Sequence, residues 1–346
     1  MALRRSSIVY GVLGIVLITL AAVTRPIIAP LLTRLPGNTD VSAGFSGTAT
    51  VLNSKALAAG DTAHALLSGV PATMDRRVHV VKTKGDTALV ADDLTIHIGT
   101  NSAPSTSRYA VDRGDFNAVE APAGWKNVER AKGLTVIFPI HPKADNTYTY
   151  YNPLTQTTAR VVFQGTGRAS GHDVNRYKIS VTGALKSSDV LATLPPALPK
   201  KLAKSFVSQL PAATAAALAP KTAALPDPIP LSYTVATVID VFLDQDSGLV
   251  LDSHYQERVT ANVTAGKKEI PLLPVLALDV KPTAATKADM ADKAGTIDTK
   301  LLMIRTVAPL TLLGVGLLLL TIAVLRRRRP AVVQPVTKET VAMTAG

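Results

Sequence analysis

The chain has 346 residues, of which 47% are hydrophobic and only 18% are charged, and its formal net charge is +12. This composition is too apolar for a disordered chain and more apolar than that of an ordinary soluble domain. Because the chain has no cysteine, disulfide bridges, thiolate zinc sites and cysteine nucleophiles are all excluded.

The excess positive charge is concentrated at the two ends of the chain. Residues 1–25 and 326–346 hold eight of the 37 Lys and Arg and one of the 25 Asp and Glu, a net charge of +7. Residues 26–305 carry only +5 and mix both signs. This central region also shows no zinc-finger or RNP-like motif, so we expect no nucleic-acid partner.

The first predicted element is a transmembrane helix over residues 6–24, after a cytoplasmic N-terminus of residues 1–5. Ser6–Val23 contains no charged residue. At about 1.5 Å per residue it gives roughly 27 Å of helix, close to the hydrocarbon thickness of a bilayer. Two arginines precede the stretch, which makes a cleaved signal peptide the alternative. The length of the apolar run favours a retained anchor.

Residues 25–282 are predicted to form an extracytoplasmic β-rich domain. Short runs of β-branched and aromatic residues are separated by Gly, Pro, Asn and Asp, a pattern typical of antiparallel strands. Lys84-Gly85-Asp86 predicts a hairpin turn. The predicted strands are Val78–Thr83, Ala88–Ile98, Leu134–Phe138, Tyr148–Tyr151, Ala159–Gln164, Arg176–Val181, Tyr233–Leu243 and Leu249–Thr260.

A Pro/Ala-rich segment, residues 186–230, interrupts this strand pattern. Lys200–Gln209 places apolar residues at i, i+4 and i+8, which predicts one face of a helix. Prolines divide the rest of the segment into short pieces. We interpret it as short helices that cap the sheet, with a poorly ordered surface insertion as the alternative.

The chain is predicted to end with a helical stalk over residues 283–305, a second transmembrane helix over residues 306–325 and a basic cytoplasmic tail over residues 326–346. Thr306–Leu325 is uncharged and gives about 30 Å of helix. Positive residues beside a span favour the cytoplasmic side. Both termini are therefore predicted to be cytoplasmic, with the main domain outside the plasma (inner) membrane. The residues expected to set this topology and to contact lipid head groups are Arg4, Arg5, Arg326, Arg327, Arg328 and Arg329.

The predicted fold class is a membrane-anchored α+β protein. Sequential strands with little intervening helix favour an antiparallel sheet over a doubly wound layout. We expect a mainly antiparallel β ectodomain, a curved or barrel-like sheet with short helices, between two transmembrane helices.

Motifs for catalysis or metal binding are missing from the sequence. There is no H-E-x-x-H, G-x-S-x-G or P-loop, so we expect neither an enzyme nor a cofactor. Asp244-x-Asp246-x-Gly248 resembles the start of a calcium loop but lacks the later ligands, which favours a hairpin turn. The six histidines show no ligand spacing. His79 and His97 can face each other if their strands pair, which favours a structural pair over a metal site. No catalytic, cofactor-binding or metal-ligating residue is predicted.

A set of short motifs extends over nearly the whole chain, and the motifs are specific as a set. They are Ile27–Pro30, Gly47–Leu52, Gly133–Pro139, Asn146–Tyr150, Tyr151–Thr155, Val174–Tyr177, Tyr233–Asp240, Asp246–Gly248 and Tyr255–Glu257. Together they resemble the PorA (porin PorA-like) family of actinobacterial membrane proteins, once of unknown function. The resemblance implies a porin. Two helical spans enclose no pore in one chain, so a channel would require oligomerisation.

The layout of two anchors around a β-rich ectodomain is also similar to that of class B scavenger receptors, whose ectodomains enclose an apolar tunnel for lipid. This likeness is architectural and rests on no shared motif. We therefore expect a cell-envelope integral membrane protein whose ectodomain binds a lipid or other apolar molecule, in envelope lipid handling or transport. The alternatives are a structural scaffold and an oligomeric, porin-like pore. Expected partners are membrane lipids, a lipid-like ligand, other envelope proteins and further copies of the chain.

Overall fold

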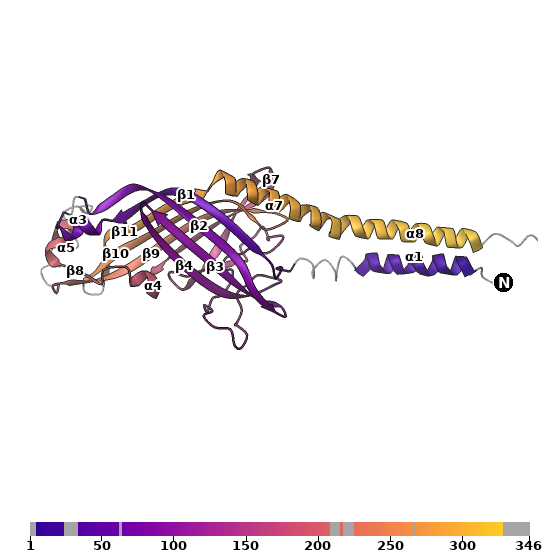
Figure 1. The fold of residues 1–346 in the computed structure, drawn as a ribbon, viewed down its shortest axis with the longest axis horizontal. Coiled ribbons are helices and arrows are strands. Elements are labelled where there is room, and N and C mark those ends of the chain that lie inside the picture. The colour runs from indigo at the N-terminus through magenta and orange to yellow at the C-terminus, as the bar shows by residue number, and fades with distance from the viewer. Residues whose placement is uncertain are drawn as a thin grey trace, which may run out of the picture. The chain divides into compact units, whose positions relative to one another are not determined.

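The computed structural model describes residues 5–23, 34–61, 64–207, 215–216, 225–265 and 268–327. The chain divides into two compact units. Residues 33–299 form one unit, called the β domain below, and residues 1–32 with 300–346 form the other. Figure 1 shows the elements of both units.

The β domain is built on an antiparallel sheet that curls around its own inner face (Figure 1). Its strands are β1 Asp40–Leu52, β2 Leu66–Lys84, β3 Thr87–Ile98, β4 Asn101–Asp112, β5 Thr149–Asn152, β6 Thr157–Ala169, β7 His172–Ala184, β8 Ala197–Leu198, β9 Ile229–Asp244, β10 Val250–Ala265 and β11 Lys268–Pro282. The strand order is β4-β3-β2-β1-β11-β10-β9-β7-β6-β5, and β8 pairs with β9. The expectation of a curved, mainly antiparallel sheet is confirmed.

The two outermost strands of this order are joined by backbone bridges. Ala118 bridges both Val111 of β4 and Gly133. The next residue, Leu134, bridges Tyr150 of β5. Through these isolated bridges the loop between β4 and β5 pairs with both outer strands of the half-barrel at one point.

The prediction of a strand over Leu134–Phe138 is wrong, because only Leu134 takes part in a bridge. Val136, Ile137 and Phe138 pack instead against the core cluster that contains Tyr109. Their apolar character therefore reflects burial beneath the loop and not pairing in the sheet.

The connections to the helices leave the sheet from two neighbouring strands. β1 and β11 are antiparallel partners, with Phe45 opposite Pro282. The beginning of β1 and the end of β11 consequently lie at the same end of the sheet. Thr283 N donates to Gly44 O over 2.9 Å, and α7 (Ala284–Leu302) begins directly after it.

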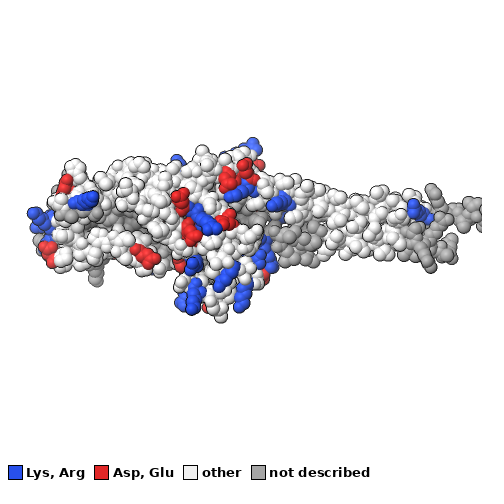
Figure 2. All heavy atoms as spheres, viewed as in Figure 1, with Lys and Arg blue, Asp and Glu red and all other residues white. Residues whose placement is uncertain are grey.

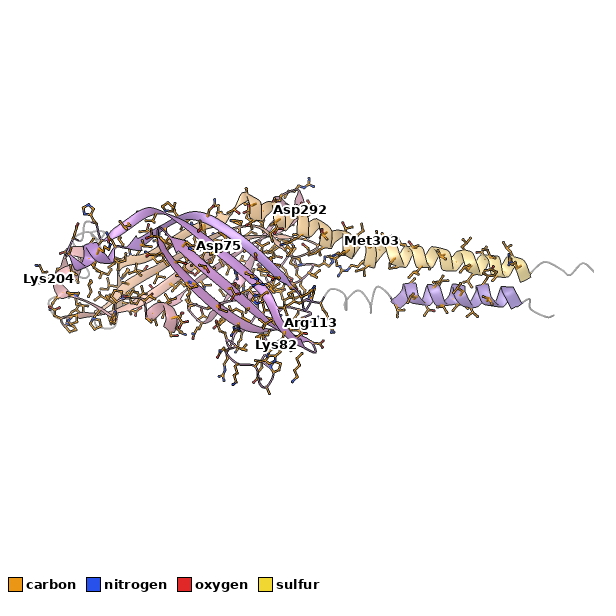
Figure 3. The ribbon with its side chains drawn as sticks, in the orientation of Figure 1. Asp75, Lys82, Arg113, Lys204, Asp292 and Met303 are labelled. Atoms are coloured by element: carbon orange, nitrogen blue, oxygen red, sulfur yellow. The ribbon has the colours of Figure 1, made fainter. Side chains whose placement is uncertain are left out.

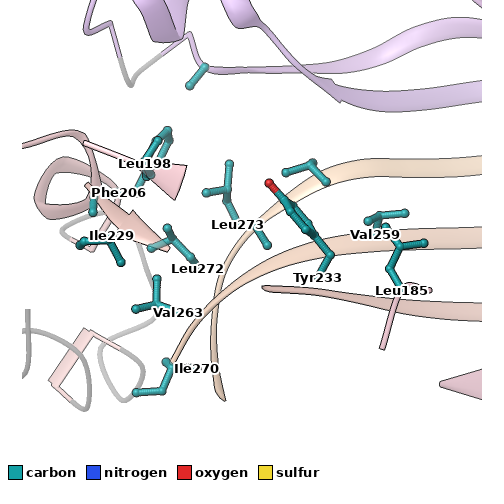
Figure 4. Close-up of a cluster of buried hydrophobic side chains, with 14 of the residues drawn as sticks. Leu185, Leu198, Phe206, Ile229, Tyr233, Val259, Val263, Ile270, Leu272 and Leu273 are labelled. Carbon is teal, nitrogen blue, oxygen red and sulfur yellow. The ribbon is translucent and has the colours of Figure 1, made fainter. Parts of the chain in front are cut away.

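The Pro/Ala-rich segment covers the opposite end of the core. Leu198, Ala203 and Phe206 are buried in one cluster with side chains of β9, β10 and β11 (Figure 4). Lys204 marks this end of the β domain in Figure 3, and Lys82 and Arg113 mark the other. The segment therefore contributes α5 Lys200–Val207 to the cover of the core at this end, within the predicted helix Lys200–Gln209. The other short helices of the β domain are α3 Ser54–Ala58 and α4 Ser188–Leu191. Residues 208–214 and 217–224 of the segment lie outside the described part of the chain.

The second unit contains two apolar helices. One is α1 (Arg5–Val23), and the other continues from α7 through the π-helical turn η2 (Met303–Val307) into α8 (Ala308–Arg327). α1 and α8 touch at two glycines: a Cβ added to Gly14 would lie 2.8 Å from the Gly316 carbonyl oxygen. Small residues allow this close approach of helix backbones.

Among the described residues, Ala284–Arg326 is the one helix that is long and apolar enough to cross a membrane. The apolar stretch of the first helix, Val9–Val23, is shorter. The structure thus has one long apolar C-terminal helix and one short apolar N-terminal helix, and the expectation that both span a membrane stays a prediction.

Candidate ligand-binding site

Five polar side chains meet on the inner face of the curled sheet. These residues, the inner polar cluster, are Arg76 of β2, Asp92 of β3, Tyr150 of β5, and Tyr255 and Glu257 of β10. Although β2, β5 and β10 are not neighbours in the sheet, the charge of Arg76 acts on both tyrosines. The five side chains therefore face one another across the interior of the curl.

Arg76 and Asp92 form the central ion pair of this cluster. Arg76 Nε donates to Asp92 Oδ1 over 2.8 Å, and Arg76 Nη2 donates to Asp92 Oδ2 over 2.9 Å. Two parallel hydrogen bonds hold both planar groups in one orientation. The Arg76 side chain still keeps 30% of its accessible surface and that of Asp92 keeps 14%. Since both side chains point inward, this remaining surface faces the interior of the sheet.

Tyr255 and Glu257 form the second part of the cluster. The Tyr255 hydroxyl donates to Glu257 Oε2, and Glu257 is only 7% exposed. Burial raises the pKa of Glu257, although the hydrogen bond from Tyr255 opposes this shift. Burial also raises the pKa of Tyr150 to about 12, against the opposing charge of Arg76. Glu257 thus holds a proton more readily than an ordinary carboxyl group and can donate or accept a hydrogen bond.

Apolar side chains beside the cluster are incompletely covered. Phe45, Val51, Leu94, Ile96 and Ile98 pack against a buried core cluster, and Tyr255 packs against the same cluster. Each of these five side chains keeps intermediate exposure. A polar group bordered by accessible apolar walls has the composition of a site for a molecule with one polar and one apolar part.

A second concave region lies on the outer face of the sheet, next to α7. This groove has a volume of about 500 Å³ and includes Lys178, Asp240, Asp252 and Lys287 in its lining. Lys287 Nζ lies 2.8 Å from Asp252, and Lys178 Nζ lies 3.9 Å from Asp240. Figure 2 shows the same mixture of both charges over the visible face of the β domain. The lining of the groove is mixed, because Val241 and Phe242 lie in it beside the charged side chains.

The arginines predicted to set the topology lie at the ends of the apolar helices. The Arg326 guanidinium lies 5.0 Å from the centroid of the Tyr10 ring, a cation–π contact between α8 and α1. Arg5 begins α1 and Arg327 ends α8. Their contact with lipid stays a prediction. The predicted residues that lie outside the described part of the chain are Arg4, Arg328 and Arg329.

The predicted pairing of His79 with His97 is wrong. In the register of β2 and β3, His79 lies opposite Ala91 and His97 lies opposite Thr73. The two-residue turn of this hairpin fixes the register, and it places the two histidines far apart along the strands.

The comparison with known families agrees with the motifs found in the sequence. A family model described as Porin PorA matches residues 6–325. The chain belongs to the PorA family. No curated protein matches it.

Two of the motifs that resemble the PorA family, Asn146–Tyr150 and Tyr255–Glu257, contain three of the five residues of the inner polar cluster. Those motifs were the available sequence signal for the site, but nothing in them indicated that the three side chains meet.

Membrane association of this PorA-family protein is suggested by the name of the family and by the long apolar helix Ala284–Arg326. The curled β domain is the part of the protein in which the structure brings the inner polar cluster and partly exposed apolar side chains together.

Proposed function

We propose that this PorA-family protein is an integral membrane protein of the cell envelope whose β domain binds a lipid or another apolar molecule with a polar head. The head contacts the inner polar cluster, and the apolar part lies along the partly exposed walls formed by residues such as Leu94 and Ile96. The observation that carries the proposal is the accessible surface of Arg76 and Asp92 on an inward-facing ion pair. A fully packed interior would leave no such surface.

The proposed activity is binding without chemical conversion, in the handling or transport of envelope lipids. Arg76 and Asp92 already form two hydrogen bonds with each other. A carboxylate held in this way is better suited to the recognition of a polar head than to the activation of a nucleophile. We propose no cofactor for this site.

The proposed location is the plasma membrane, with both termini cytoplasmic and the β domain outside. The beginning of β1 and the end of β11 lie at the same end of the sheet, as anchoring through both ends of the chain requires. Arg326 at the end of α8 supports a cytoplasmic C-terminus because positive residues flank spans on that side.

The proposal is tested with full-length protein extracted in a mild detergent. Native mass spectrometry should show bound lipid, which denaturation in organic solvent should release for identification. Ile96→Trp, which adds bulk on the inner face, should lower lipid occupancy at least roughly tenfold. Val162→Trp is the matched control, because Val162 is an exposed strand residue, and it should leave occupancy unchanged.

Lipid-free protein, or equal occupancy in both variants, would contradict the proposal. Protein partners captured by cross-linking to a lipid-free chain would favour a scaffold. Ion conductance of the purified protein in planar bilayers would favour the pore that the family name implies.

A further inference from the structure

Three potential metal ligands converge where α7 passes over one end of the sheet. They are His172 at the start of β7, Asp244 at the end of β9 and Asp298 on α7. One ligand atom from each residue lies within 4.8 Å of the other two. The three residues are far apart in the sequence, so only the folded β domain brings them together.

Asp244 is oriented by the turn between β9 and β10. Its Oδ1 accepts hydrogen bonds from Ser247 N and Ser247 Oγ, each over 2.7 Å, and from Asp246 N over 3.2 Å. The residue is only 3% exposed. Its second oxygen, Oδ2, lies 3.2 Å from His172 Nδ1. The sequence pattern around Asp244 was interpreted as a hairpin turn, and the turn aims this carboxylate at His172.

Asp298 approaches the same imidazole from the helix. Its Oδ2 lies 3.4 Å from His172 Nδ1, whereas Oδ1 is buried and has no hydrogen-bond partner. Gly295 of α7 lies beside the same imidazole, since a Cβ added there would be in van der Waals contact with His172 Cε1, at 3.8 Å.

The arrangement is unfavourable without a cation. The carboxylates of Asp244 and Asp298 both lie against the single imidazole of His172, and two carboxylates that share one site repel each other. The buried Oδ1 of Asp298 has no hydrogen-bond partner, which adds a further cost. A bound cation would remove both penalties, because it would neutralise the two carboxylates and coordinate the unpartnered oxygen.

We propose that His172, Asp244 and Asp298 bind a divalent metal ion, with Zn²⁺ as the best match, and that the ion fastens α7 to the sheet. Imidazole nitrogen and carboxylate oxygen are both established zinc ligands, and three protein ligands leave a fourth position for water. The hard cations Mg²⁺ and Ca²⁺ prefer oxygen ligands alone. The hydrogen bonds that hold Asp244 supply the support that metal ligands usually receive from their neighbours.

The test uses untagged full-length protein in detergent, stripped with EDTA and then titrated with ZnCl2. Calorimetry should show one zinc ion per chain, and zinc should raise the unfolding temperature, followed by the fluorescence of Trp125. Asp298→Asn and His172→Gln should weaken zinc binding by at least roughly 100-fold. Asp289→Asn is the matched control, because this aspartate lies on α7 but pairs with Lys293, and it should bind zinc as the natural chain does.

The Asp298→Asn variant also separates a loss of zinc binding from a loss of folding. It removes a like charge, so the metal-free variant should melt no lower than the metal-free natural chain. Failure of the natural chain to bind zinc, or equal zinc affinity of the Asp298→Asn variant, would overturn the proposal. Tighter binding of Mg²⁺ or Ca²⁺ than of Zn²⁺ would overturn the assignment to zinc.

Discussion

Replacing Arg76 with methionine should destabilise the β domain by leaving Asp92 inside the sheet without its two hydrogen bonds from the guanidinium. Breaking a fully buried ion pair costs about 3–5 kcal/mol. Because the pair keeps part of its accessible surface, water can replace some of the lost interaction, and we expect about 2–3 kcal/mol. For a domain of this size that lowers the unfolding temperature by roughly 4–10 °C.

Thermal unfolding of the full-length protein in detergent, followed by circular dichroism, measures this effect. Arg77→Met is the matched control: Arg77 pairs with Asp40 through Nε over 2.9 Å, but both side chains are about half exposed. That variant should change the unfolding temperature little. Arg76→Met with Asp92→Leu removes both charges and should recover at least half of the loss. If Arg76→Met behaves like Arg77→Met, or if the double variant is the least stable, the argument for an inward-facing ion pair fails.

Three further predictions concern other parts of the chain. Burial raises the pKa of Glu257, so its contribution to stability is present at low pH and is lost as the pH rises through the raised value. Glu257→Gln should therefore flatten melting temperatures measured between pH 4 and pH 8, and an unchanged pH profile would contradict this. A Cβ at Gly11 would lie 3.9 Å from Ala323 Cβ, within disulfide range. Cysteines at both positions should form an oxidant-dependent cross-link visible by gel mobility, whose absence would refute the packing of α1 on α8. Gly248 has a φ of +73°, and an added Cβ would lie 2.2 Å from Pro139 O. Gly248→Ala should cost at least about 2 kcal/mol in denaturant unfolding, and a neutral result would contradict that contact.

Local patterns in the sequence predicted the hairpins well. Lys84-Gly85-Asp86 joins β2 to β3 as expected, with a φ of +59° at Gly85. The turn at Asp246–Gly248 joins β9 to β10. These pairings depend on residues close together in the chain, so turn chemistry and alternating side chains were enough to identify them.

The strand β11 could not be predicted in the same way. It contains Pro271 and Pro274, and local rules place proline at strand edges or bulges. β11 nevertheless lies between β1 and β10 in the sheet. Both prolines coincide with irregularities in its register with β10. Only the long-range pairing of β1 with β11 shows that this segment is a central strand.

The inner polar cluster escaped prediction for a related reason. Asp92 and Glu257 each occur within runs that predict strands, but strand alternation alone gives no partner for either. Their neighbours come from four strands whose arrangement depends on the order and curl of the whole sheet. The same holds for His172, Asp244 and Asp298, which come from two strands and a helix.

The pairing of the first strand with the last has a consequence for biosynthesis. Phe45 of β1 lies opposite Pro282, the last residue of β11. At about 5–20 residues per second, a ribosome needs roughly 10–50 s to make the chain between them. During that interval one side of β1 has no partner in the sheet, and the growing chain must be kept from aggregation. The β domain is therefore expected to complete its fold only after the last strand has been made, as the second apolar helix is being synthesised.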